Sequence, residues 1–102
     1  MTAIDFAIRK DAIMAQLTRK VAEMLFIVRP DKRIRVEYRR MTPEILANYD
    51  PWYVQYHRLV PGDEYMLVWD LEFGDLLYAV NVTGDSYLYC VKELLDLIAE
   101  KF

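Results

Sequence analysis

The chain has 102 residues, of which 55% are hydrophobic, 14% aromatic and 28% charged. This length suits a single domain over residues 1–102, which should bury about two-thirds of the surface that the unfolded chain exposes. The composition argues against intrinsic disorder. No segment approaches the roughly 18–20 uncharged apolar residues of a membrane span, so we expect no membrane association.

Charge divides the chain into two unlike parts. Residues 1–40 carry ten Lys/Arg and five Asp/Glu, a net of +5, whereas residues 41–102 carry three and eleven, a net of −8. This division predicts either a bipolar surface or two faces that neutralise each other. The only cysteine, Cys90, excludes an intrachain disulfide and fits a reducing compartment. Since no basic segment precedes an apolar run near Met1, we expect no secretory signal and a cytoplasmic protein.

Residues 11–28 have the spacing of an amphipathic helix. Lys10 would lie in the middle of the apolar stripe, so the first ten residues fit the pattern less well. They could extend the helix, capped by Thr2 and Asp5, or alternate as a short edge strand from residue 4 to residue 8. We favour the early helix start. The apolar stripe contains Ile13, Leu17, Val21, Met24, Leu25 and Val28.

A strand with a basic outer face should follow this helix. Pro30 ends the helix, because proline cannot continue it. From Arg33 to Arg39 charged and apolar side chains then alternate, which predicts a half-buried strand. Thr42-Pro43-Glu44 is a helix start, with a capping hydroxyl, a proline at the first position and an acid near the positive end. This helix must be short, because Asp50-Pro51 follows it.

Residues 52–60 are ambiguous. Asp50-Pro51 could open a helix, but the aromatic and β-branched residues that follow prefer a pleated surface, so we predict a strand. Residues 65–72 and 76–82 then indicate a hairpin. The last element is a helix from about Ser86 to the end, capped by Asp85 or Ser86. Together these elements predict an α+β fold: a three- to four-stranded antiparallel sheet with a long N-terminal helix and a C-terminal helix packed on it.

Residues suited to catalysis or metal binding are few. His57 and Cys90 are the only histidine and the only thiol, and they would form a nucleophilic pair only if the fold brought them together. Cys90 lies on the border of an apolar helical stripe, where a free cysteine usually behaves as a small buried hydrophobe. One histidine and one cysteine fall short of the ligand set of a zinc site. We therefore predict a protein without catalytic residues, metal or cofactor, and not an enzyme.

Three interpretations use the charged segments. The basic stretch 33–40 could follow a nucleic-acid backbone, although Tyr38 falls on the apolar side of the strand and gives the arginines no stacking platform. The acidic segment 63–75 could instead mimic a phosphate backbone, as in a small inhibitor from a mobile element that acts on a DNA-handling protein. The same segment could neutralise the arginines of strand 33–39 within the sheet. The arginines of the nucleic-acid interpretation are Arg33, Arg35, Arg39 and Arg40.

A cluster of aromatic residues precedes the predicted hairpin. Buried, these residues are core; exposed, they have the composition of an interface hot spot. Trp69 lies within an apolar strand and has the stronger claim to the interior, so we expect the cluster around Trp52 to be exposed. Our principal prediction is a non-catalytic protein-interaction or assembly module that forms a homodimer, with nucleic-acid binding as the alternative. The predicted interface residues are Tyr49, Trp52, Tyr53 and Tyr56.

Overall fold

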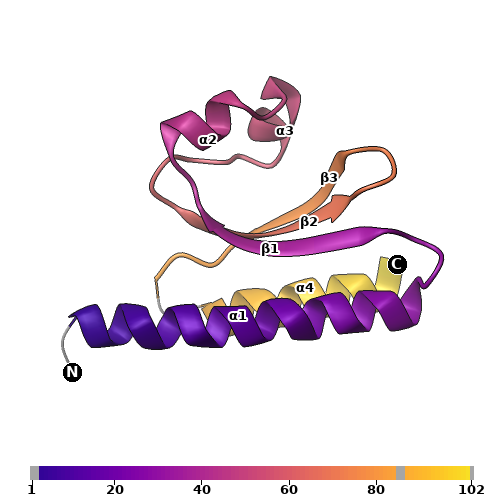
Figure 1. The fold of residues 1–102 in the computed structure, drawn as a ribbon, viewed down its shortest axis with the longest axis horizontal. Coiled ribbons are helices and arrows are strands. Elements are labelled where there is room, and N and C mark those ends of the chain that lie inside the picture. The colour runs from indigo at the N-terminus through magenta and orange to yellow at the C-terminus, as the bar shows by residue number, and fades with distance from the viewer. Residues whose placement is uncertain (1–2, 85–86, 102) are drawn as a thin grey trace.

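The computed structural model describes residues 3–84 and 87–101 as three layers. The helices α1 and α4 cover one face of the sheet, and α2 and α3 lie over the other (Figure 1). This arrangement confirms the predicted α+β fold, with three strands in the sheet. The elements in chain order are α1 (Ala3–Val28), β1 (Ile34–Arg40), α2 (Pro43–Ala47), α3 (Pro51–Tyr56), β2 (Glu64–Asp70), β3 (Asp75–Asn81) and α4 (Tyr87–Lys101).

The sheet is antiparallel, in the order β1-β2-β3. β1 pairs with β2 in a register that places Arg35 opposite Trp69 and Arg39 opposite Tyr65. Since opposite residues share a face of the sheet, these two arginines lie on the same face as two aromatic residues of β2. β2 is the central strand, so β1 forms an edge of the sheet.

The main core lies between the sheet and the two long helices. On the helix side, α1 contributes the apolar stripe that the sequence predicts. On the sheet side, alternate residues of β2 contribute to the same core. Its buried members are Met14, Val21, Leu25, Met66, Val68, Val82, Tyr87, Val91 and Leu94. A second core lies on the opposite face, under α2 and α3, and contains Met41, Leu59, Tyr65, Leu67 and Leu76. β2 is therefore covered on both faces.

The strand predicted over residues 52–60 is wrong, because Pro51–Tyr56 form α3. Asp50 caps this helix: its Oδ1 accepts a hydrogen bond of 2.8 Å from the backbone N–H of Trp52. The cap and the proline after it outweigh the β propensity of the aromatic residues, which depends on packing more than on the backbone. The helix predicted after Thr42 is confirmed as α2, with the Thr42 hydroxyl accepting from the N–H of Ile45 at 3.2 Å.

The early helix start is confirmed, since α1 already begins at Ala3. Thr2, which we expected to contribute to the cap, lies outside the described residues, and so do Asp85 and Ser86, the expected cap of α4. The backbone of Cys90 belongs to α4, but its side chain is also outside the description.

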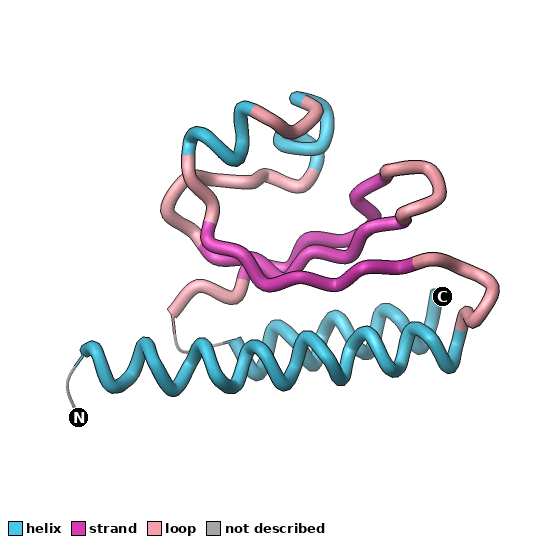
Figure 2. The backbone as a smooth tube through the Cα atoms, in the orientation of Figure 1, coloured by secondary structure: helices cyan, strands magenta, loops and turns pink. Residues whose placement is uncertain are grey.

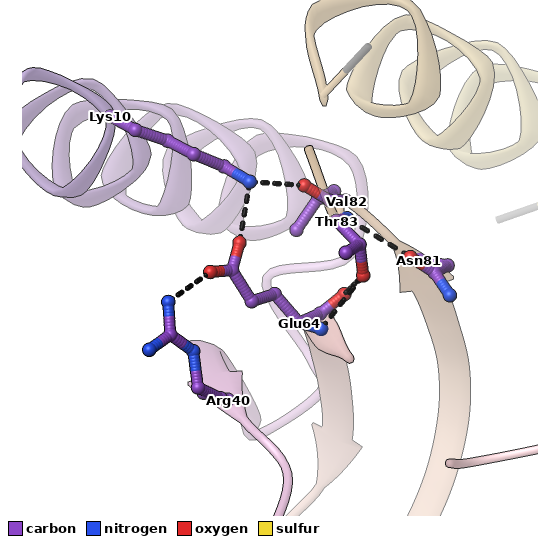
Figure 3. A network of polar contacts seen from close by, with 6 residues as sticks. All are labelled: Lys10, Arg40, Glu64, Asn81, Val82 and Thr83. Carbon is purple, nitrogen blue, oxygen red and sulfur yellow. Dashed lines mark hydrogen bonds and ion pairs between the residues drawn. The ribbon is translucent and has the colours of Figure 1, made fainter. Parts of the chain in front are cut away.

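Lys10 occupies the centre of the buried stripe and is only 4% exposed. Its Nζ donates to Glu64 Oε2 at 2.5 Å and to the carbonyl oxygen of Val82 at 2.6 Å. Glu64 also accepts from Arg40 Nη2 at 2.6 Å, and its own backbone N–H donates to the Thr83 hydroxyl at 2.9 Å. This network joins α1 to the end of β1, the start of β2 and the end of β3 (Figure 3). The cation that fitted the stripe poorly thus has a buried carboxylate as its partner.

Candidate functional site

The predicted interface residues divide into an exposed pair and a half-buried pair. Trp52 and Tyr56 are 58% and 67% exposed, and they lie one helical turn apart on α3. Their rings are stacked, with centroids 4.9 Å apart and an interplanar angle of 10°. We call this pair the Trp52–Tyr56 ridge. Tyr53 turns toward β3, where its hydroxyl donates to Asp75, and Tyr49 packs edge-on against Trp69 at 5.4 Å.

A shallow apolar groove of about 630 Å³ lies next to this ridge, between α2 and α3. Leu46, Val54, Leu59 and Val60 contribute its apolar lining. Among the described residues that line it, Arg58 alone is charged. α3 therefore carries the ridge and also lines the groove, through different residues.

Polar contacts hold the loop after α3 against the sheet. Tyr65 of β2 donates its hydroxyl hydrogen to the carbonyl oxygen of Arg58 at 3.2 Å and accepts from the N–H of Val60 at 2.9 Å. Arg58 has a positive φ of 54°, which is costly for a residue other than glycine. His57 Nε2–H donates to the carbonyl oxygen of Leu76 at 3.0 Å. Burial lowers the pKa of His57, although that hydrogen bond opposes the shift.

Tyr65→Phe should therefore loosen this loop. The substitution keeps the ring in the core but removes both hydrogen bonds, leaving the N–H of Val60 without its partner. The expected cost is about 1–3 kcal/mol in the free energy of unfolding. Denaturant titration measures it, with Tyr56→Phe as the control because the hydroxyl of Tyr56 belongs to an exposed residue. Equal stability of the two variants would contradict the assigned role.

The structure does not bring together all four arginines proposed for nucleic-acid binding. Arg40 belongs to the Glu64 network on the side of α1, and Arg33 is exposed before β1 begins. Arg35 and Arg39 line a hollow of about 230 Å³ on the α2–α3 face of the sheet, together with Tyr49 and other residues. The structure thus separates Arg40 from the rest of the predicted set.

Two aromatic residues accompany the arginines in this hollow. Trp69 Nε1–H donates to Glu37 Oε1 at 2.9 Å, and Glu37 Oε2 lies 3.4 Å from Arg35 Nη2. Arg39 Nη1 donates to the hydroxyl oxygen of Tyr49 at 3.4 Å. Tyr38 lies on the helix side, as its place in the alternation indicated. The expected lack of an aromatic platform is nevertheless wrong, because the neighbouring strand and the α2–α3 connection supply one.

Neutralisation of the basic segment by the acidic one involves the ends of β1. Arg40 pairs with Glu64, and Lys32 Nζ lies 3.9 Å from Asp70 Oδ2. Arg35, by contrast, has its carboxylate partner, Glu37, on its own strand. The acidic segment 63–75 therefore does not neutralise Arg35, whose side chain is more than half exposed.

Within residues 3–84 and 87–101, no group of three or more His, Cys, Asp or Glu is placed to hold a metal ion. No helix in the same ranges is long and apolar enough to cross a membrane. The nucleophilic pair considered for His57 and Cys90 lies outside the described residues, because the side chain of Cys90 is not among them. Comparison with protein-family models, curated proteins and solved structures finds no match to this chain.

Proposed function

We propose that this chain is a non-catalytic assembly module that forms a two-fold homodimer through α2 and α3. The observation that carries the proposal is the Trp52–Tyr56 ridge, a stacked aromatic pair more than half exposed beside an apolar groove. Tryptophan and tyrosine are the residues most enriched in interface hot spots. An exposed apolar patch of this kind usually marks a contact surface.

A second copy of the chain suits this surface in shape and in charge. A two-fold axis presents the same patch on both copies, so the ridge of each can enter the groove of the other. Arg58 lines the groove, and Asp50 caps the helix from which Trp52 projects. Arg58 and Asp50 thus provide opposite charges on this surface, which a self-complementary contact can pair.

Trp52→Ala should convert the dimer to a folded monomer. Truncation of a hot-spot tryptophan costs about 2 kcal/mol or more in association, which is roughly a 30-fold increase in the dissociation constant. Light scattering and sedimentation across a concentration series measure this constant. Because Trp52 is largely exposed in one copy, circular dichroism should show an unchanged fold.

The matched control is Phe26→Ala, which truncates another exposed aromatic side chain (69% exposed) on α1, in the opposite layer. It should leave the dissociation constant unchanged. A wild-type chain that stays monomeric at high micromolar concentration contradicts the proposal. Equal weakening by the Trp52 and Phe26 variants does so as well.

A further inference from the structure

One end of the sheet's α2–α3 face is left open. α2 and α3 lie over one end of the sheet, whereas the β2–β3 hairpin and the start of β1 extend past them (Figure 2). Arg35 and Arg39 point to this face from β1, and the alternation of the strand carries the row back to the exposed Arg33. Side chains on one face of a strand repeat about every 6.6–6.8 Å. The edge of the sheet thus carries Arg33, Arg35 and Arg39 in one row, with Glu37 between the last two.

Aromatic rings lie beside this row. Trp69 is opposite Arg35 in the register, and Tyr49 meets it edge-on with an interplanar angle of 81°. The hollow lined by these rings and arginines has a volume of about 230 Å³. Sites that enclose a whole drug-sized ligand are larger, with volumes of roughly 300–1,000 Å³. The hollow suits a single planar ring that belongs to a longer ligand.

The carboxylates of the hollow are already engaged. Glu37 uses one oxygen for the indole of Trp69 and the other for Arg35, so it orients both groups. Asp70 is buried, accepts from the backbone N–H of Glu72 at 3.0 Å and lies near Lys32. The more exposed charge of the row therefore comes from arginine, and its natural complement is a polyanion.

We infer that this open face binds single-stranded nucleic acid, with a base inserted against Trp69 and Tyr49 and the phosphates along Arg33, Arg35 and Arg39. Aromatic rings with flanking cations bind unpaired bases with little sequence preference, whereas a duplex keeps its bases stacked and offers only phosphates. The inference does not rest on the proposed dimer: the Trp52–Tyr56 ridge takes no part in it, although Tyr49 lines both this hollow and the groove between α2 and α3.

The test is a titration of a labelled 12-nucleotide oligothymidylate with the full chain at several salt concentrations. Fluorescence anisotropy measures the binding constant. Each phosphate contact to a single strand contributes about −0.7 to the slope of log K against log salt, so three arginines predict a slope near −2. The double variant Arg35→Gln/Arg39→Gln should bind at least tenfold more weakly at 50 mM salt and with a flatter slope. In a Trp52→Phe background the emission of Trp69, then the only tryptophan, should be quenched by the oligonucleotide.

The charge-matched control is Arg9→Gln/Arg19→Gln, which removes two exposed cations from α1 in the opposite layer. It should change neither affinity nor slope. Equal weakening by the two double variants means diffuse charge attraction and overturns the inference. Equal affinity for a duplex of the same length, or no binding at 50 mM salt with 100 μM protein, also overturns it. Circular dichroism of each variant verifies the fold.

Discussion

Glu64→Gln is expected to lower the free energy of unfolding by about 3–5 kcal/mol. Glu64 is buried where it accepts hydrogen bonds from Lys10 and Arg40. The amide keeps the size of the side chain but removes its charge, which leaves the buried ammonium of Lys10 without a counter-ion. A domain of this kind is stable by only about 5–15 kcal/mol, and its melting temperature falls by about 4–8 °C per kcal/mol. Thermal and urea unfolding should therefore show a large loss.

An exposed ion pair provides the control. Asp31→Asn removes the pair between Arg29 and Asp31, whose atoms are 3.0 Å apart, and surface pairs contribute at most about 1 kcal/mol. Adding Lys10→Met to Glu64→Gln should recover part of the loss, because the uncompensated cation is then gone. A Glu64→Gln variant within 1 kcal/mol of the wild type contradicts the role assigned to the pair.

The same network predicts a dependence on pH. Burial raises the pKa of Glu64, but hydrogen bonds from Arg40, Lys10 and Tyr38 outweigh burial and hold this pKa below its ordinary value. The carboxylate therefore contributes its full stabilisation above the unfolded-state pKa of about 4.3, and this contribution is lost as the pH falls toward the lower pKa of the folded state. Urea unfolding between pH 7 and pH 3 should show a steeper acid loss for the wild type than for Glu64→Gln.

The sequence predicts the elements that have a strong local signal. The apolar stripe of α1, the alternation of β1 and the capping hydroxyl with proline at the start of α2 are each encoded within a few neighbouring residues. The hairpin of β2 and β3 carries a similar period-two pattern. These signals determine the layers of the fold, and the structure confirms them with shifts of one or two residues at the ends.

The sequence does not predict which distant residues meet. Lys10 interrupts an apolar stripe, and nothing local indicates that Glu64, 54 positions later, lies opposite it. The aromatic platform beside Arg35 depends on the β1–β2 register, which places Trp69 across from it. α3 was predicted as a strand because aromatic β propensity reflects the packing of a particular site, and here the cap by Asp50 determines the backbone.

Leu67→Ala is expected to cost about 2–5 kcal/mol, because it opens a cavity under α2 and α3. Leu67 is completely buried in the central strand and belongs to the second core with Met41, Leu59 and Tyr65. The control, Leu71→Ala, changes a residue that is 45% exposed beyond the end of β2 and should cost less than about 0.5 kcal/mol. Chemical unfolding measures both values.

Leu67→Ala and Met66→Ala should differ in which part of the structure becomes less stable. Met66 is the adjacent residue of β2 and packs on the opposite face, against the long helices, so its truncation should cost a similar amount but loosen α1. Hydrogen exchange should show faster opening of α2 and α3 in Leu67→Ala and of α1 in Met66→Ala. Because α3, which carries the Trp52–Tyr56 ridge, packs on the second core through Tyr53 and Val54, Leu67→Ala should also weaken self-association, whereas Met66→Ala should not. Identical exchange patterns in the two variants would mean that the layers on either side of the sheet unfold as one unit.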